Sequence, residues 1–522
     1  MPIYQAGALN TTALSAPGVY LQIQPPPLII NGVPSNLLGL VGVASWGPVN
    51  APTLVGSPGD VTQYIGANTV RKYDLATACE VAFKFGATAI QYVRVTDSTD
   101  TAASLTLKDT FSTPATGATL TGFYTGTIGN TITAGVVAGS AANTFKLTIQ
   151  RPGATAEVFD NIPGSSASVF WPALVSAVNN GQSSGRGPSQ MVVASIGVAT
   201  ALPNIVTVYT ASGGLDGATT MTDALLVGTD GVGTAKKGMY ALRGTGCQVG
   251  TLIDHTDSTA WASILAYGLS EGTYMGVQSP NGSNYSATST LLNTAGADGY
   301  GIKTFVGDWI TYYDNTNGQN RTIAPATVWA ALQSGLSPEQ SSLNKPMLGF
   351  VGTQRVAQKQ PYSSAEIGAI KTARLDVITN PSPGGNYYAC QTGVNSSSTN
   401  GQNGDTYTRM TNYLALTLAS AFGTVIGKNQ TSDLRLSAQN AMQAFLTTLW
   451  RAKMIGDSNN SANVPFTVEI DAANNPAAAV ANGYMTANVA VKFWAVVFYF
   501  VINLQGGQTV VIQSTSKPNT GI

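Results

Sequence analysis

Residues 466–504 read FTVEIDAANNPAAAVANGYMTANVAVKFWAVVFYFVINL. Residues 466–471 have the pattern of a strand, and a polar bend follows at Asn474-Asn475-Pro476. A short alanine-rich turn ends at Asn482-Gly483, and residues 485–504 form a long run rich in β-branched and aromatic side chains. Because these patterns are strands and turns that contain no catalytic motif, we interpret the stretch as an assembly module.

The sequence on both sides of this stretch extends the module. Residues 432–454 predict an amphipathic helix. Its apolar residues recur at helical spacing and should face a core, with an interface stripe as the alternative: Leu434, Ala438, Met442, Phe445, Leu449 and Met454. After residue 504, a Gly506-Gly507 hinge precedes residues 508–513, which predict a detachable strand.

Four segments near the N-terminus add to this order. Residues 16–24 read APGVYLQIQ, a strand, and residues 39–50 read GLVGVASWGPVN, a buried strand that ends in a Gly-Pro turn. Residues 55–66 end in QYIG, and residues 76–95 end in IQYVRV, as a helix and strand would. Together with the C-terminal order of helix, strand, Asn-Asn-Pro bend, Asn-Gly, strand and free tail, these segments resemble the contractile-tail sheath proteins of bacteriophages.

This resemblance implies a fold of α/β plus β class. It comprises a subtilisin-like-topology α/β domain with an inserted β-sandwich, and an α+β C-terminal assembly domain with exchanged terminal strands. The resemblance concerns topology and implies no proteolytic site. The family normally carries an acidic pair after its Pro-Gly-Val-Tyr strand, where this chain has Gln22 and Gln24, so no charge is predicted at that strand.

Changes in composition predict the domain boundaries. At Thr96 the sequence becomes rich in Thr, Ser, Gly and Ala, with short strand patterns and one helix at residues 168–178, which indicates an inserted β-sandwich. The expected segments are an N-terminal strand-exchange arm (1–34), the first part of the α/β domain (35–95), the inserted β-sandwich on the outer surface (96–213), the second part of the α/β domain (214–380), a polar linker (381–407), the C-terminal α+β assembly domain (408–504) and a C-terminal strand-exchange arm (505–522).

Strands and helices alternate on both sides of the insertion, which predicts a parallel sheet with helices on its faces. The first strand, residues 37–44, is apolar throughout, as in a covered sheet. The predicted helices span 75–85, 260–268, 287–294 and 324–335, and the predicted strands after the insertion span 248–254, 273–277, 305–313 and 347–351.

Strands on flexible leads can pair with the sheet edge of a neighbour through main-chain hydrogen bonds. The leads here are Pro25-Pro26-Pro27 and Gly506-Gly507. In the sheath family both termini are exchanged between adjacent subunits. The resemblance therefore implies inter-subunit strand exchange through Val19, Tyr20, Leu21, Ile23, Thr509, Val510, Val511 and Ile512.

The resemblance also implies partners. Subunits would form a homo-oligomer of stacked rings, hexameric in the family, around a tail tube protein and together with baseplate and tail terminator proteins. In the family a helix of the C-terminal domain touches the tube. The candidate tube contacts here are Asn474, Asn475, Asn482 and Lys492, with a solvent-exposed turn as the equal alternative.

Charge is scarce in this chain. Only 10% of the 522 residues are charged, and 25 basic residues balance 25 acidic ones, whereas about 25% is usual for soluble domains. This composition fits a subunit that is covered by copies of itself, with a secreted β protein as the alternative. Zero net charge argues against nucleic-acid binding, which needs clustered Lys and Arg.

Neither a membrane span nor a signal peptide is predicted. The start, MPIYQ, lacks the basic and apolar regions of a signal peptide. Residues 493–502 are the most apolar window, but a spanning helix needs about 20 residues. Their Val, Phe, Tyr and Ile content predicts a buried strand.

The residues with chemical potential form no convincing active site. Gly181-Gln-Ser183-Ser-Gly185 matches a nucleophile pattern, and His255 is the single histidine, but the flanks of Ser183 predict a loop where that pattern needs a strand and a helix. Asp254 and Asp257 beside His255 fit a helix N-cap better than a metal site. The cysteines lack metal or redox spacing and should be small buried residues, with inter-subunit disulfides as the alternative: Cys79, Cys247 and Cys390. We expect no enzymatic activity, no cofactor and no metal.

The predicted function is that of the structural subunit of a contractile phage tail sheath. Such subunits contract by rearranging around the tube and drive it through the host envelope, which leads to genome ejection. The protein would be assembled in the host cytoplasm and end in the virion tail. The alternative is the sheath of a phage-derived contractile injection system or bacteriocin, and a remote one is a secreted β-rich adhesin or hydrolase.

Overall fold

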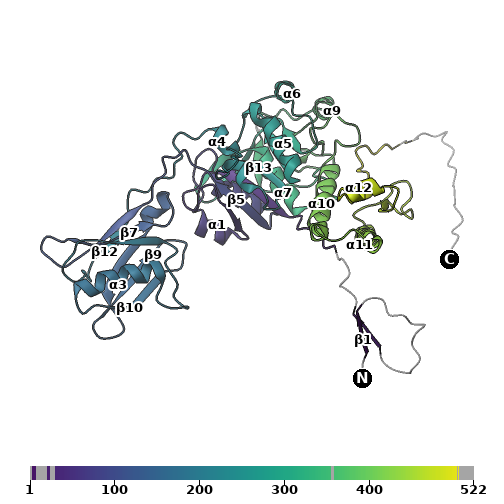
Figure 1. Cartoon of the computed structure of the whole chain (residues 1–522). Coiled ribbons are helices and arrows are strands. Elements are labelled where there is room, and N and C mark those ends of the chain that lie inside the picture. The colour runs from purple at the N-terminus through teal and green to yellow at the C-terminus, as the bar shows by residue number, and fades with distance from the viewer. Residues whose placement is uncertain are drawn as a thin grey trace, which may run out of the picture.

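The computed structural model describes residues 3–6, 20–23, 30–353, 355, 358–502 and 504. A central α/β region carries a β-rich unit on one side and the helices α10, α11 and α12 on the other (Figure 1). Near the N-terminus, β1 (Ile3–Ala6) pairs in parallel with β2 (Tyr20–Ile23). The chain is therefore a mixed α/β protein with several separate sheets.

The central region is built on a seven-stranded sheet. Its strand order is β19-β15-β14-β13-β3-β5-β4. All neighbours pair in parallel except β4 and β5, which are antiparallel. The strands are β3 (Leu37–Gly42), β4 (Pro52–Val55), β5 (Ala89–Arg94), β13 (Val249–Leu252), β14 (Tyr274–Gln278), β15 (Ile302–Phe305) and β19 (Leu375–Asp376). Every residue of β13, β14 and β15 is buried, as in a sheet covered on both faces.

Helices cover both faces of this sheet. α2 (Leu75–Lys84) and α7 (Pro325–Gly335) pack on one face, where the Trp329 side chain is fully buried. α5 (Trp261–Glu271), α6 (Tyr285–Thr294) and α9 (Ser364–Thr372) pack on the other. The helices expected in these four regions of the sequence, at 75–85, 260–268, 287–294 and 324–335, are confirmed. Two shorter helices, α1 (Pro58–Tyr64) and α4 (Asp223–Val227), flank the region.

Two strands that were predicted for the parallel sheet differ in the structure, where a small antiparallel sheet is present. β16 (Ile310–Asp314) pairs with β17 (Gln319–Ile323) and β18 (Phe350–Thr353) outside the parallel sheet. The single strand expected at residues 305–313 is wrong, because the chain turns between β15 and β16. A Cβ at Gly307 would lie 2.2 Å from the Pro280 carbonyl oxygen, so this turn requires glycine. The strand expected at 347–351 belongs to this small sheet.

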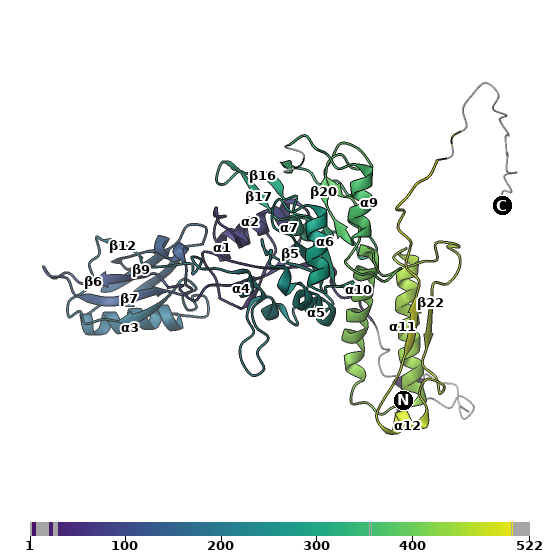
Figure 2. The ribbon, with the colours of Figure 1, turned by 90° about the horizontal axis from the view of Figure 1, so that it is seen from above.

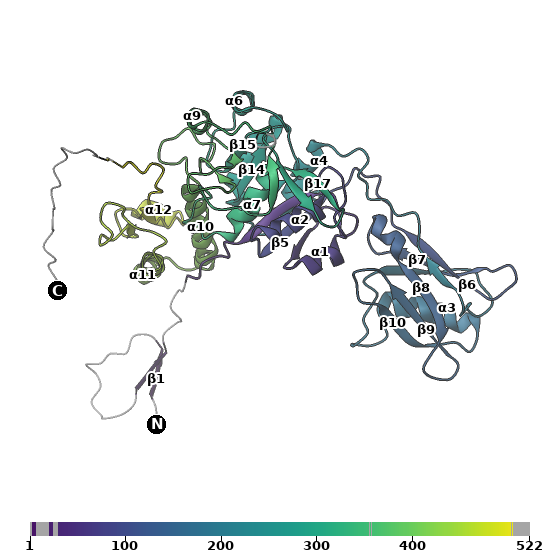
Figure 3. The same ribbon diagram turned by 180° about the vertical axis from the view of Figure 1, so that it is seen from behind.

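The β-rich unit between residues 103 and 211 has two sheets (Figure 3). One has the order β10-β9-β8-β12, the other the order β11-β7-β6, and α3 (Ala167–Asn180) packs on them. The helix expected at 168–178 is thus confirmed. The strands are β6 (Ser104–Lys108), β7 (Thr116–Gly122), β8 (Thr133–Ala138), β9 (Thr144–Gln150), β10 (Glu157–Pro163), β11 (Val192–Ile196) and β12 (Val208–Thr210). We call this unit the sandwich.

Residues 381–407 do not behave as the expected polar linker. β21 (Ala389–Cys390) pairs with β20 (Ile378–Thr379), and residues 392–397 are buried. Their amides satisfy a buried carboxylate, since Asp376 accepts hydrogen bonds from the backbone N–H groups of Gln391, Thr392 and Gly393, each at 3.0 Å. The polar composition of residues 392–397 therefore reflects buried hydrogen bonding, whereas residues 383–386 and 398–401 of the same segment are exposed.

The C-terminal region consists of helices and one hairpin-like sheet. α10 (Asp405–Phe422), which was not predicted, and α11 (Ser432–Arg451) lie side by side (Figure 2). β22 (Phe466–Glu469) pairs antiparallel with β23 (Asn488–Val491), and α12 (Ala477–Ala481) lies between them in sequence. No helix in the described ranges is both long enough and apolar enough to cross a membrane.

Candidate assembly surface

The β22–β23 sheet has one covered and one open face. Val468 and Ile470 are buried against α11, and Val489, Val491 and Phe493 pack at the margin of the same core. The apolar stripe predicted on the long helix supplies the other side of this core: Ala438, Met442, Phe445 and Leu449 are buried, while Leu434 and Met454 are half-buried. The stripe is thus a core face, as expected.

The two outer edges of this sheet differ in how many of their backbone groups are free to pair with another strand. Among the described residues, no further strand pairs with β22 or β23. The Lys492 N–H donates to the Pro465 carbonyl at 2.7 Å, and antiparallel pairing alternates inward and outward groups. The backbone groups of Val489 and Val491 therefore point away from β22. On the other edge, the Val468 carbonyl already accepts a hydrogen bond from Gln439 Nε2 at 3.1 Å, so β23 offers the more open edge.

One of the candidate tube contacts, Asn475 in the polar bend, is buried. Asn475 is only 3% exposed. Its Oδ1 accepts from the Thr486 N–H at 2.7 Å, and its Nδ2 donates to the Thr486 carbonyl at 2.9 Å. Asn475 therefore ties the bend to the start of the second strand, and its side chain is buried within the subunit. Asn474 beside it is half-buried and donates to the Glu469 carbonyl at 2.7 Å.

The other two candidate tube contacts lie at the surface. Asn482 is exposed at the end of α12. The Lys492 side chain is 67% exposed and forms an ion pair with Asp457 at 2.8 Å. The hydrogen bond from Lys492 lowers the pKa of Asp457 below its usual value. Asn482 and Lys492 are therefore the exposed members of the candidate set, Asn474 is half-buried and Asn475 is buried.

The apolar run after β23 is half-buried at its start and exposed from residue 497 to 502, and it forms no strand, so the buried strand expected at residues 493–502 is wrong. Phe500 is 83% exposed, and its neighbours Val497, Tyr499, Val501 and Ile502 are similarly uncovered. Phe498 and Tyr499, in the second half of the run, contact α9 of the α/β region: Lys371 Nζ donates to the Tyr499 hydroxyl at 3.1 Å and lies 3.9 Å from the centre of the Phe498 ring. The composition of the run matches a buried strand, but among the described residues no strand pairs with it.

The predicted exchange residues are only partly described. Tyr20, Leu21 and Ile23 lie in β2, which pairs with β1 of the same chain, and no other strand among the described residues pairs with β2. Val19 and the tail residues Thr509, Val510, Val511 and Ile512 lie outside the described residues.

The residues considered for catalysis do not form a site. Ser183 is exposed in a loop of the sandwich, and its Oγ accepts from the Arg186 N–H at 3.1 Å. His255 is buried after β13, and burial lowers the pKa of its imidazole. Asp257 caps the following 3₁₀ turn by accepting from the Thr259 N–H, as predicted, whereas Asp254 accepts from the Tyr73 N–H. Among the described residues, no three His, Cys, Asp or Glu side chains are grouped to hold a metal ion.

All three cysteines are free and buried. An inter-subunit disulfide, which the sequence left open, would therefore require the core to open.

A buried charge cluster connects the C-terminal region to the central sheet, and no sequence pattern predicted it. Lys303 on β15 lies 2.8 Å from Asp376 on β19 and 2.9 Å from Asp405 at the start of α10, and all three side chains are fully buried. Burial would raise the pKa of Asp405, but Lys303 and hydrogen bonds from Ser342 and Tyr274 outweigh burial and lower it. The two carboxylates raise the pKa of Lys303 above its usual value despite burial.

This architecture is that of contractile tail sheath proteins. No family model and no curated protein matches the sequence. A sheath tail protein from Listeria innocua superposes with a TM-score of 0.58 at 16% identity, covering 85% of this chain and 90% of that one. One from Desulfitobacterium hafniense gives 0.55 at 16% identity, covering 87% and 94%. The contracted helical sheath of the anti-feeding prophage gives 0.52 at 10% identity, covering 95% and 100%. These structures are sheath proteins, and at such identities the likeness establishes the shared fold.

Proposed function

We propose that this protein is the structural subunit of a contractile sheath, which polymerises as stacked rings around a tail tube. The observation that carries the proposal is the open edge of β23 beside an uncovered apolar run, on a chain with the sheath fold. Monomeric soluble proteins rarely expose contiguous apolar surface of this kind, and an exposed strand edge is a template for another chain. Both features fit a subunit that is completed by its neighbours.

Strand exchange supplies the connection between subunits in this proposal. The tail strand, with Val510 and Ile512, would add to the β23 edge of a neighbour, where the backbone groups of Val489 and Val491 point outward. The free edge of β2 would pair likewise. Contraction is then a rigid-body rearrangement of subunits that stay connected through their termini. A subtilisin-like arrangement of the central sheet, inferred from the family resemblance, belongs to the same proposal.

Two settings for such a sheath remain. In a phage, the subunit would be part of the virion tail, assembled in the host cytoplasm with tube, baseplate and terminator proteins, and contraction would lead to genome ejection. In an injection system, the same subunit would drive a tube without a genome. The second setting is kept because the anti-feeding prophage sheath and the sheath of an extracellular contractile injection system both align over 95% of this chain.

Microscopy of two variants tests strand exchange. Full-length protein should form tubes or rings in negative stain, and a chain that ends at Leu504 should stay monomeric. Tubes from both proteins would support the sheath function and show that assembly does not require the C-terminal segment after Leu504. Monomers from both, even after addition of a purified tube, would contradict the sheath function.

A substitution pair tests the β23 edge. Val489→Pro removes an outward N–H, which an edge strand tolerates without loss of its own ladder. Val489→Ala loses the same packing against α11 but keeps the N–H. We expect tubes from Val489→Ala and none from Val489→Pro. Equal assembly of the two would show that neighbours do not use this edge.

A further inference from the structure

The sandwich is joined to the α/β region by two chain crossings that pair with each other. Thr101 on the outgoing crossing and Leu215 on the returning one exchange two backbone hydrogen bonds, each of 3.1 Å. Ser104 and Ser212 pair in the same way one step further out. A two-stranded ribbon of this kind would bend easily by itself, since an isolated pair of strands is marginally stable. The contacts that fix the orientation of the sandwich relative to the α/β region must therefore lie beside the ribbon.

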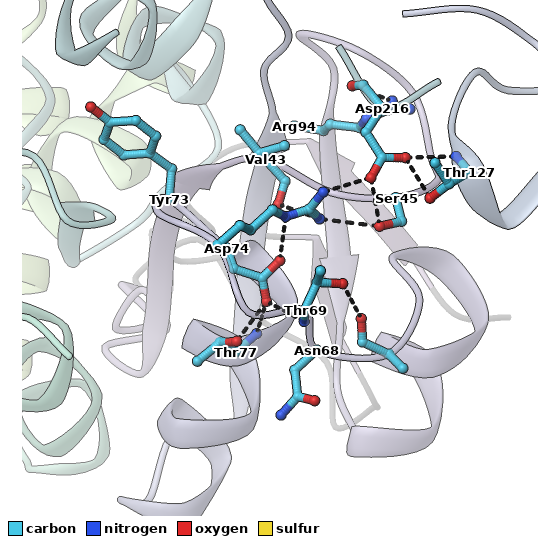
Figure 4. Close-up of polar contacts among 12 residues, drawn as sticks. Val43, Ser45, Asn68, Thr69, Tyr73, Asp74, Thr77, Arg94, Thr127 and Asp216 are labelled. Atoms are coloured by element: carbon cyan, nitrogen blue, oxygen red, sulfur yellow. Dashed lines mark hydrogen bonds and ion pairs between the residues drawn. The ribbon is translucent and has the colours of Figure 1, made fainter. Parts of the chain in front are cut away.

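One carboxylate at the end of the ribbon bonds to both sides of the junction (Figure 4). Asp216 Oδ1 accepts from the N–H and hydroxyl of Thr127, at 2.6 and 2.8 Å, on the sandwich side. Asp216 Oδ2 accepts from Ser45 Oγ at 3.0 Å and Arg71 Nη1 at 2.6 Å on the α/β side. The Asp216 side chain is only 12% exposed, so solvent screens these bonds weakly.

The α/β side of this contact is already held in place. Arg71 Nε donates to Asp74 Oδ1 at 2.7 Å, and Asp74 is the N-cap of α2, where its Oδ2 accepts from the Thr77 N–H. The buried Arg94 guanidinium donates to the carbonyls of Gly47 and Thr125 at 2.7 and 2.8 Å, again one on each side. The Arg71 guanidinium that Asp216 contacts is therefore itself held in position by Asp74, the N-cap residue of α2.

Packing brings the two sides close enough for these bonds. Trp46, from the loop after β3, is buried in the core of the sandwich and makes an edge-on ring contact with Tyr124 at 5.6 Å. Gly126 has φ +128°, and a Cβ there would lie 2.1 Å from the Ser45 carbonyl oxygen. The junction thus combines an inserted side chain, a backbone approach that requires glycine, and a shared carboxylate.

We propose that Asp216 is a positioning residue that locks the sandwich to the α/β region, so that the two move as one rigid body. In its absence Trp46 would still anchor the sandwich, but the sandwich could pivot about that anchor. The inference concerns the geometry of the single subunit. It holds or fails independently of the proposed sheath function.

Hydrogen exchange on the full-length subunit tests the lock. With Asp216→Ala, the amides of Thr101, Thr127 and Leu215 should exchange about tenfold faster or more, because hydrogen bonds to a charged group contribute strongly to local closure. Amides of β7 and β9 inside the sandwich should keep their protection. The matched control is Asp160→Ala, whose carboxylate bonds only within the sandwich, to Ser140 and Asn161, and it should leave the junction unchanged.

A second variant keeps the test decisive if Asp216→Ala does not fold. Asp216→Asn preserves the shape and removes the charge, so the junction amides should exchange faster than in the wild type and slower than in the alanine variant. Unchanged junction protection in Asp216→Asn would overturn the proposal. Equal loss of protection at the junction and across β7 and β9 would also overturn it, because the carboxylate would then serve the fold of the sandwich.

Distance measurement provides the orientation readout. The three native cysteines are buried, so spin labels can be placed on cysteines introduced at Val137 on β8 and Thr290 on α6, which are both exposed. Wild type and Asp160→Ala should give one narrow distance distribution. Asp216→Ala should broaden it, and a distribution as narrow as that of the wild type would refute the lock.

Discussion

Replacing Lys303 by methionine should lower the unfolding free energy of the α/β region by about 3–5 kcal/mol at pH 7, the cost of removing one partner from a buried ion pair. Lys303 is fully buried between Asp376 at 2.8 Å and Asp405 at 2.9 Å. Methionine fills similar volume, so the loss comes from charge. It leaves two carboxylates without a cation at positions of 0% exposure, where an unpaired charge is costly.

The loss should depend on pH in a defined direction. In the wild type the folded-state pKa of Asp405 is lowered, so its contribution is present above the unfolded pKa of about 3.9 and is lost as the pH falls through the folded value. Without Lys303, burial should raise the pKa of Asp405, which disfavours folding as this carboxyl ionises. The difference between the variant and the wild type should therefore be largest near neutral pH and shrink as the pH approaches 4.

Urea titration followed by hydrogen exchange of peptides from β15 and α10 measures this loss locally, since a chain with several folding units is not two-state. The control is Lys236→Met at an exposed loop position, where a change within about 0.5 kcal/mol is expected. Adding Asp376→Asn and Asp405→Asn to the Lys303 variant should restore part of the stability. A loss below about 1 kcal/mol in the single variant would refute the assignment of this cluster as the charge lock between sheet and α10.

Three other outcomes follow from single side chains. Asp254→Asn should stabilise the protein by about 1–3 kcal/mol above pH 6 in denaturant titrations, because burial raises the pKa of Asp254 to about 6 and the wild type loses stability between the unfolded and folded pKa values; a gain that is equal at pH 4 would contradict this. Trp46→Ala should destabilise the sandwich by about 3–5 kcal/mol in hydrogen exchange, and intact protection there would show that the tryptophan is not part of its core. Asn475→Ala should cost about 1–3 kcal/mol by leaving the Thr486 amide unpaired, seen as faster proteolysis at the bend, whereas Asn482→Ala at the exposed neighbouring site should not.

The elements that could be predicted from the sequence are those whose own residues show a capping residue, a helical spacing of apolar side chains or a continuous apolar run. α2 begins after Asp74, whose side chain accepts from the Thr77 N–H, and its apolar spacing marks one face. β3 is a continuous apolar run, as a covered parallel strand must be. Such local signals predicted α2, α5, α6 and α7 within a few residues, whereas α4 and α9 were not predicted.

The failures arise where structure depends on distant partners. Nothing local distinguishes β18 in the small sheet from a strand of the parallel sheet. The hydroxyl-rich residues 392–397 are buried because they hydrogen-bond to β19 and β15, through Asp376 and the Ile302 carbonyl. The run at residues 493–502 has the composition of a core strand, but residues 497–502 are exposed, and composition alone does not show whether a run has a partner. Asn475 has the composition of a surface bend, and only the return of Thr486 to it makes it structural.

The position of Trp46 limits how this chain can change over evolutionary time. The tryptophan belongs to the α/β region by sequence and to the sandwich by packing. A genetic exchange that replaced the segment between residues 96 and 213 by an unrelated module would leave a large indole without cover. The inserted segment therefore cannot be exchanged independently of the α/β region. A replacement must provide a pocket for the Trp46 side chain, or a second mutation must replace Trp46.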